Sequence, residues 1–170
     1  MKRGLFLICL IGVAGSTMGQ QESGNRSLPP LTRIYDPGAN AAREISDAVK
    51  KALAEHKHVL LLAGGDWCSW CREFNRFVHA DSSIDSLLGK CFVVYHLNYS
   101  EENKNLEIFA RYGYPQRFGF PVFIILDGQG KQIHTQNSEY LEQGRSYSAK
   151  RVKDFLLQWT PQALDPSLYK

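Results

Sequence analysis

The sequence is poor in cysteine and methionine, and after its first residues it has no long apolar run. It contains four cysteines and two methionines in 170 residues. It has no internal repeat and no low-complexity tract, which excludes a solenoid and a fibrous protein. Without an apolar run of about 20 residues, no membrane-spanning helix is predicted beyond the N-terminal segment. An apolar share of 44% and a charged share of 22% fit a globular protein, and the length suits one domain.

The first residues have the layout of a secretory signal peptide rather than of a membrane anchor. A basic start, Lys2 and Arg3, precedes an apolar run over 5–13, and small residues follow that run. The run is too short to span a bilayer comfortably. We therefore expect residues 1–19 to be a signal peptide that is cleaved on export, leaving a chain with no stable membrane insertion.

The sequence also lacks a strong excess of charge of either sign. Its formal net charge is +3, and this falls to +1 when Lys2 and Arg3 leave with the leader. A nearly neutral mature chain gives no reason to expect a nucleic-acid partner. The cysteines that remain after the leader are Cys68, Cys71 and Cys91. In an exported chain, one pair and one further thiol is the simplest arrangement of an odd number of cysteines.

Composition divides the rest of the chain into a lead-in, one domain and a tail. Residues 20–33 are mostly polar and contain a Pro-Pro pair, so we expect a flexible lead-in there. Residues 34–160 are expected to form the domain, and residues 161–170 a C-terminal tail.

Within the domain, predicted helices alternate with predicted strands. Helices are expected over 40–56, 67–79 and 100–113, with Asn40 and Ser100 as N-caps, and from Ser146 or Ser148 to about residue 160. Buried strands are expected at 58–63, 91–99 and 121–126, with a hairpin partner at 131–135 and a very short strand near Ile34 and Tyr35. This alternation implies an α/β fold with a mainly parallel sheet, helices on both faces and an antiparallel edge.

Two cysteines three residues apart, Cys68 and Cys71, stand at the start of the helix expected at 67–79. The first amides of a helix have no intrahelical acceptor and carry partial positive charge, so they favour a thiolate at Cys68. A thiolate is the attacking species in disulfide exchange. Cys71 lies one turn further along the same face, near enough to close a disulfide. The pair can therefore carry out attack, mixed-disulfide formation and internal resolution without any other cofactor.

Three other interpretations of this pair stay open. A zinc half-site would need two further ligands, for which the sequence offers only Cys91 and scattered histidines without a second pair. A purely structural disulfide would close a loop too short to constrain the unfolded chain much. The third is a redox-silent binding module that has kept the motif. We expect no metal and no other cofactor.

The residues around the cysteines resemble the thioredoxin-like family. The stretch "HVLLLAGGDWCSWC" is similar to that family's strand followed by Trp-Cys-x-x-Cys. The stretch "FGFPVFIILDGQGK" is similar to its proline, strand and turn, and "YHLNY" to the strand between them. The resemblance covers Tyr35 to Trp159. It implies a thioredoxin-like α/β fold, with a central mixed sheet flanked by helices on both faces.

The resemblance also implies roles for individual residues. Cys68 is expected to be the nucleophile and Cys71 the buried resolving thiol. Pro121 matches the cis-proline that presents backbone to an extended substrate. A proline that enters a strand cannot donate a ladder hydrogen bond, which independently marks this position. The expected substrate-binding residues are Trp67, Trp70, Phe120 and Pro121.

Two positions depart from the family pattern. Leu62 stands where the family often has a buried carboxylate that helps proton transfer at the resolving thiol, and His96 stands where a lysine is frequent. His96 and Asp66 are therefore candidate proton relays. The alternatives are a packed histidine on a buried strand and a solvated loop acid.

Cys91 opens the strand expected at 91–99. A small buried hydrophobic residue is the favoured interpretation of this cysteine. A third redox thiol is the alternative.

The sequence thus predicts an exported, monomeric thiol–disulfide oxidoreductase of the bacterial periplasm or the secreted fraction. It would act on protein or peptide disulfides and dithiols through a reversible Cys68–Cys71 disulfide, together with an unidentified redox partner. The alternative is a non-catalytic thioredoxin-fold binding or chaperone-like protein. The direction of exchange, whether reduction, oxidation or isomerisation, is not predicted.

Overall fold

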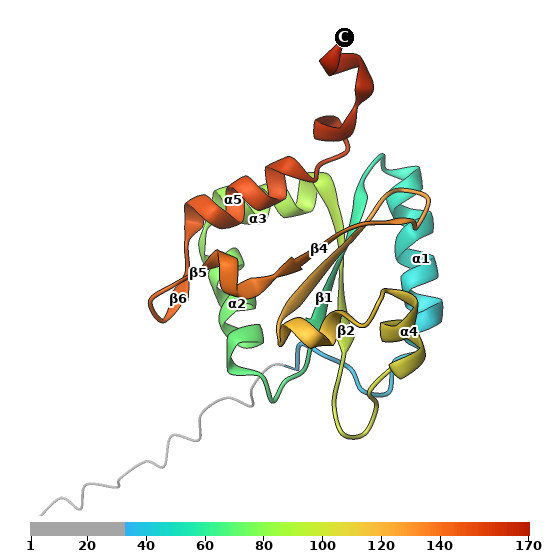
Figure 1. The fold of residues 1–170 in the computed structure, drawn as a ribbon, viewed down its shortest axis with the longest axis vertical. Coiled ribbons are helices and arrows are strands. Elements are labelled where there is room, and N and C mark those ends of the chain that lie inside the picture. Colours follow the sequence, from blue (N-terminus) through green and yellow to red (C-terminus); the bar gives the residue numbers. More distant parts are fainter. Residues whose placement is uncertain (1–32) are drawn as a thin grey trace, which may run out of the picture. The chain divides into compact units, whose positions relative to one another are not determined.

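Four strands form the central sheet, in the order β2-β1-β3-β4 (Figure 1). The structure is a computed structural model that describes residues 33–170, so the expected signal peptide and nearly all of the expected lead-in lie outside the described residues. The strands are β1 (His58–Gly64), β2 (Phe92–Asn98), β3 (Val122–Leu126) and β4 (Gln132–Asn137). The expected mixed sheet is confirmed.

Only one of the three strand pairings is parallel, so the expectation of a mainly parallel sheet is wrong. Strand β1 runs parallel to β2 and antiparallel to β3, and β3 runs antiparallel to β4. The reason lies in the connection between β2 and β3, whose helix, α4 (Leu106–Arg111), has six residues. Such a helix rises about 9 Å, while a seven-residue strand extends about 23 Å. The chain therefore enters β3 at the same end of the sheet at which β2 ended.

Helices cover both faces of the sheet, as expected (Figure 1). On one face lie α1 (Ala41–Ala54) and α4, and on the other lie α2 (Ser69–Ala80), α3 (Ser82–Cys91) and α5 (Ala149–Gln158). Successive side chains of β1 point to opposite faces of the sheet, so they divide between the two helix-covered cores. Leu61 belongs to the core under α1, whereas Leu60 and Leu62 belong to the core under α2, α3 and α5.

The predicted helices differ from the observed ones mainly at their starts. Asn40 caps α1 as expected, because its side chain accepts a hydrogen bond from the Arg43 amide. The helix expected at 100–113 begins only at Leu106. In the loop before it, Ser100 Oγ accepts from the Asn98 side chain at 3.1 Å and from the Asn103 amide at 3.4 Å. These side chains offer the backbone an alternative to the helix, so Ser100 is not a helix cap.

Helix α3 was not predicted, and it changes the setting of Cys91. This cysteine is the last residue of α3 and does not open a strand. Strand β2, which follows, is an edge strand of the sheet with an exposed Val94, so the expectation of a fully buried strand at 91–99 is wrong. A small antiparallel pair of strands, β5 (Glu142–Gln143) and β6 (Ser146–Tyr147), was also not predicted.

The segment at Ile34 and Tyr35 does not form the expected short strand. Its amides donate instead to the side chain of Asp66, at 3.1 Å and 3.3 Å. At the other end, the expected tail folds into two short 3-10 turns, Gln162–Leu164 and Pro166–Tyr169, which extend away from the sheet (Figure 1). Within residues 33–170, no helix is both long and apolar enough to cross a membrane.

Candidate active site

The two cysteines of the motif are joined by a disulfide at the start of α2. Cys68 occupies the N-cap position, and its sulfur accepts a hydrogen bond from the Cys71 amide at 3.1 Å. Their Cα atoms are 5.2 Å apart. Cys68 is 5% exposed and Cys71 is 2% exposed, so Cys71 is the more enclosed of the two. This arrangement places the helix amides at the Cys68 sulfur, as the motif's position predicted.

Two glycines allow the site to pack against the end of β1. A Cβ atom at Gly64 would collide with Cys71 Sγ and would lie 3.0 Å from Tyr35 Oη. A Cβ atom at Gly65 would collide with the indole of Trp67 and would lie 2.8 Å from the carbonyl oxygen of Tyr99. Cys71 Sγ and the Trp67 indole therefore lie directly against the backbone of Gly64 and Gly65, where any side chain would displace them.

Of the two tryptophans beside the cysteines, Trp67 is the one that reaches solvent, with 58% exposure. Its Nε1 donates to the Tyr99 carbonyl oxygen at 2.6 Å, and its ring meets Phe120 edge-on with centroids 5.6 Å apart. Trp70 is half-buried and meets Tyr147 edge-on at 5.4 Å. Trp67 therefore presents an aromatic surface beside the disulfide, while Trp70 contributes mainly to the core.

Phe120 and Pro121 directly precede β3. The peptide bond between them is cis, the form that the resemblance implied for Pro121. Phe120 packs against the small cluster that contains Cys68 and Cys71. The other proline of this segment, Pro115, begins a short 3-10 turn and precedes no strand.

His96 lies on β2, where it pairs with Leu62 of β1. Its Nε2 is inaccessible and has no partner among the described residues, and its ring meets Tyr35 edge-on at 5.3 Å. Burial lowers the pKa of His96 to about 4, with a smaller lowering contribution from His79 and an opposing one from Asp66. The imidazole is therefore neutral at pH 7.

Asp66 is a half-buried structural acceptor rather than a solvated loop acid. Its carboxylate accepts from the amides of Ile34 and Tyr35, which ties the segment before α1 to the loop before α2. Arg72 donates to the carbonyl oxygen of the same residue and so folds back over that loop. Both contacts order the backbone that leads into Cys68.

Tyr35 is a site residue that sequence reasoning missed. It is 2% exposed and forms a cluster with Cys68 and Cys71. No local pattern in the sequence connects Tyr35 with cysteines more than 30 residues away. In the sequence, Tyr35 was expected only as part of a very short strand. That expectation gives it no connection with the cysteines.

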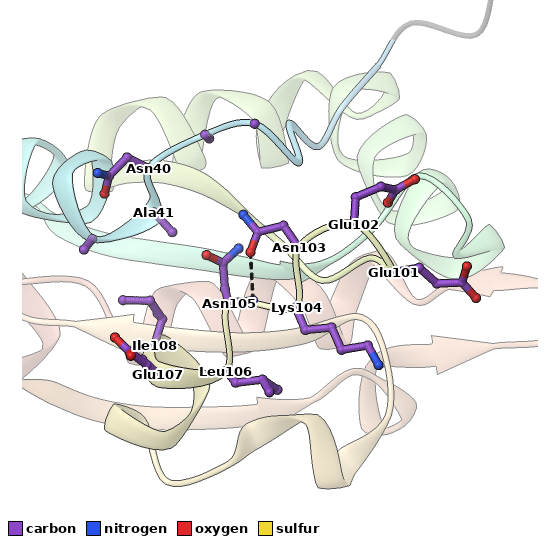
Figure 2. Close-up of a pocket in the computed structure, with 13 residues that line it drawn as sticks. Asn40, Ala41, Glu101, Glu102, Asn103, Lys104, Asn105, Leu106, Glu107 and Ile108 are labelled. Carbon is purple, nitrogen blue, oxygen red and sulfur yellow. Dashed lines mark hydrogen bonds between the residues drawn. The ribbon is translucent and has the colours of Figure 1, made fainter.

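The cavities of the surface do not by themselves locate the chemistry. A cavity of about 750 Å³ lies between the start of α1 and the segment 101–108, where the Asn105 amide donates to the Asn103 side chain (Figure 2). Neither cysteine lines it. A hollow of about 560 Å³ adjoins the disulfide region instead, lined by Trp67, Tyr99 and residues 100–102 and 104.

The remaining sequence-based candidates can also be placed. Cys91 is an unpaired, half-buried cysteine that packs against the core on the α2 side of the sheet. Within the part of the chain that the structure describes, no group of three or more His, Cys, Asp or Glu side chains could hold a metal ion. The zinc half-site interpretation of Cys68 and Cys71 therefore gains no further ligands there.

Comparisons with known proteins agree with the fold and the motif. A family model described as thioredoxin-like matches residues 40–128. The disulfide bond reductase DsbH of Chlamydia pneumoniae is 26% identical over 97 residues, which cover 52% of this chain and 57% of that protein. The thiol:disulfide interchange protein DsbD of Photorhabdus laumondii is 32% identical over 82 residues, 46% of this chain and 13% of that protein. The chain thus spans little more than half of one curated relative and a small part of the other.

Among solved structures, a disulphide isomerase from Xylella fastidiosa superposes with a TM-score of 0.67. It is 27% identical, and the match covers 75% of this chain and 97% of that one. A DsbH oxidoreductase superposes with a TM-score of 0.51 at 22% identity, covering 77% of this chain and 89% of that one. The second likeness concerns the fold alone. Together with the family model, these structures confirm the expected fold class.

Proposed function

The chain belongs to the thioredoxin-like family, and from this premise we propose that it is a thiol–disulfide oxidoreductase acting on protein or peptide disulfides and dithiols. The observation that carries the proposal is the disulfide between Cys68 and Cys71 at the N-terminal end of α2. The names of its relatives, a reductase, an interchange protein and an isomerase, support the same class of reaction. An unidentified redox partner would return Cys68 and Cys71 to the dithiol or disulfide form in which the reaction starts.

The proposed reaction proceeds by two sulfur exchanges. In the reducing direction, the Cys68 thiolate attacks one sulfur of a substrate disulfide, forms a mixed disulfide and releases the other substrate sulfur as a thiolate. Cys71 then loses its proton and attacks Cys68 Sγ, which closes the Cys68–Cys71 disulfide and releases the second substrate thiolate. Two electrons pass from the pair to the substrate, and the reverse sequence oxidises a dithiol. The helix amides at Cys68 should hold its pKa below the free-thiol value of about 8.5.

Substrate binding is proposed for the surface beside Cys68. Trp67 offers exposed aromatic area, and Phe120 and Pro121 offer the start of β3, where an extended peptide would meet backbone. The hollow beside Trp67 and Tyr99 extends this surface. Trp70 would contribute from its half-buried place behind the motif. His96 and Asp66 stay candidate proton relays for the resolving thiol, and for His96 a relay and a packing role are distinguished by the pH dependence treated below.

The decisive experiment is the substitution Cys71→Ser. It should trap substrate proteins as mixed disulfides on Cys68, because the second exchange has lost its attacking sulfur. Adducts are read from a non-reducing gel after acid quench, with Cys68→Ser and Cys91→Ser as matched controls. Cys68→Ser should form no adduct, and Cys91→Ser should behave as the wild type.

Two outcomes of this experiment would contradict the proposal. Adducts that persist in the Cys68→Ser/Cys71→Ser protein and depend on Cys91 would move the nucleophile to α3. No adducts in any variant, together with undiminished substrate binding when both motif cysteines are lost, would favour the non-catalytic binding or chaperone-like protein.

Export is the second part of the proposal. The basic start, the apolar run and the small residues within 1–19 support cleavage of a leader and delivery to the periplasm or the secreted fraction, where the mature chain would act as a monomer. Mass spectrometry of the exported protein should show a new N-terminus between Thr17 and Glu22. A cytoplasmic protein that retains Met1 would contradict it.

A further inference from the structure

Tyr35 brings a phenol hydroxyl into an otherwise sulfur-containing and apolar cluster behind the disulfide. The cluster consists of Tyr35, Cys68 and Cys71, with Ile34, Trp70 and Phe120 packed against it. Cys71 is almost completely enclosed there. A thiol in such surroundings resists ionisation, because burial disfavours the charged form. The second sulfur exchange nevertheless requires Cys71 to react as a thiolate.

Cys71 and Tyr35 both approach Gly64 at the place where any other residue would carry a Cβ atom. A single Cβ atom placed at Gly64 would collide with Cys71 Sγ and would lie 3.0 Å from Tyr35 Oη. The sulfur and the hydroxyl oxygen therefore both lie against the Gly64 backbone, each within 3.0 Å of the same point. Because both atoms lie close to one point, a hydrogen bond between them is sterically feasible once the disulfide has opened.

The orientation of Tyr35 is held from several sides. Its amide donates to the Asp66 carboxylate at 3.3 Å, which anchors its backbone to the loop before α2. Its ring meets the ring of His96 on β2 edge-on. The ionisable groups around it are Asp66 on that loop, His96 on β2 and Tyr147 on β6, together with Arg33 and Glu102, which line a small pocket with it.

We propose that the Tyr35 hydroxyl donates a hydrogen bond to the Cys71 sulfur when that sulfur is a thiolate, and so makes Cys71 a better attacking group in the resolving step. The inference rests on the proposed exchange function and assigns Tyr35 to it. No proton passes to Tyr35. The Cys71 proton leaves to solvent, the Cys71–Cys68 bond forms, and the bond between Cys68 and the substrate sulfur breaks.

The ionisation of Tyr35 itself agrees with a donor role. Burial, with a smaller contribution from the Asp66 charge, raises the pKa of this phenol well above its ordinary range. The hydroxyl therefore keeps its proton at every pH at which the exchange would run. A hydroxyl that stays protonated can donate to an anion, but it cannot act as the base that removes the thiol proton.

The experiment isolates the Cys71 thiol in a Cys68→Ser/Cys91→Ser protein and follows its alkylation by iodoacetamide against pH. Adding Tyr35→Phe keeps the ring and removes the hydroxyl. Because a hydrogen bond to a charged group is worth one to two pKa units, the Cys71 pKa should rise by about one unit or more. In the protein with both motif cysteines, release of a preformed mixed disulfide at pH 7 should slow about threefold, because an about tenfold smaller thiolate fraction is partly offset by the higher nucleophilicity of a more basic thiolate. The initial attack by Cys68 should keep its rate.

Tyr112→Phe is the matched control. Tyr112 is also a buried tyrosine, but it belongs to the core on the other face of the sheet. Its loss of a hydroxyl should leave the Cys71 pKa and the release rate unchanged. An unchanged Cys71 pKa in the Tyr35→Phe protein, or an equal rise in the Tyr112→Phe protein, would overturn the proposal.

A second measurement covers the case in which Tyr35→Phe does not fold. In the Cys68→Ser/Cys91→Ser protein, the NMR signal of the ring carbon that bears the Tyr35 hydroxyl should shift with the same apparent pKa as Cys71. A signal that does not follow that titration would refute the contact. Neither the alkylation of Cys71 nor the NMR titration of Tyr35 needs a substrate. If Tyr35 and Cys71 titrate together but the Cys71→Ser protein traps no substrate, the exchange function is refuted and the Tyr35–Cys71 contact is not.

Discussion

At the scale of single residues, one buried imidazole should make the folded chain sensitive to acid. Burial lowers the pKa of His96 to about 4 in the folded state, whereas an unfolded histidine titrates near about 6.5. Between these values the unfolded chain binds a proton that the folded chain does not. Stability is therefore complete above about pH 6.5, falls as the pH drops to about 4, and changes no further through this group below that.

We expect this group to lower the free energy of unfolding by up to about 3 kcal/mol across that window, because each pKa unit corresponds to about 1.4 kcal/mol. Urea unfolding at a series of pH values measures it. His96→Phe should flatten the profile between pH 4 and 6.5. The exposed His56 provides the control His56→Asn, which should leave the profile unchanged. An unaltered slope in His96→Phe would show that the sensitivity arises elsewhere.

The same shift bears on the proton relay. A relaying imidazole of ordinary pKa would give the resolving step an inflection near pH 6 to 7. With a pKa of about 4, His96 carries no proton to deliver at neutral pH. The structure thus favours packing for His96, and a relay stays a prediction to be tested by the pH profile of resolution in His96→Ala.

Residues of the motif could be predicted because their chemistry is contained in a short stretch. Cys68 and Cys71 needed only their spacing and a strand before them, whereas Pro121 was singled out by its resemblance to the cis-proline of the thioredoxin-like family. Tyr35 could not be found this way, since its contact with the cysteines exists only after the segment before α1 has packed beneath the motif. The same holds for Arg72, whose side chain folds back and donates to the backbone of Asp66.

At the scale of elements, two helix starts provide a matched test of capping. Asn40 caps α1 through a hydrogen bond from the Arg43 amide at 3.0 Å, whereas Ser148 holds the equivalent place before α5 without a side-chain bond. Asn40→Ala should therefore cost about 1 kcal/mol of unfolding free energy. Ser148→Ala should change it by no more than about 0.5 kcal/mol. Denaturant titration of both variants measures the difference, and equal losses would contradict the assignment.

Element prediction succeeded where apolar spacing and a cap coincided, as in α1. It failed at α3, whose sequence is rich in serine and has a glycine, residues with modest or poor helix propensity. Two signals were nevertheless present. Asp81 accepts from the Ser83 and Ile84 amides as an N-cap, and Ile84 and Leu88 bury the inner face. The burial of Ile84 and Leu88 outweighs the weak helix propensity of this segment. That burial becomes apparent only when the neighbouring helices and the sheet are in place.

At the scale of the whole molecule, the alternation of the main strands with helices was predictable and the direction of β3 was not. A count of alternating strands and helices favours parallel crossovers, but a crossover requires a connection long enough to run back along the sheet. Loop side chains at Ser100 and Asn103 shorten α4 to six residues, and the chain then turns into β3 at the near edge. The polar loop and the short helix thus accompany an antiparallel entry into β3, which periodicity within each element does not predict.

The tie between Asp66 and the segment before α1 also bears on where this domain should be said to begin. The family model recognises the chain from residue 40 onward, and that span keeps both cysteines, Gly64 and the cis peptide bond. Tyr35 lies upstream of it, yet its side chain forms the rear wall of the disulfide. A shortened chain that starts at the recognisable boundary would keep the whole motif and open its back to water. We therefore expect the functional boundary to lie at or before Ile34.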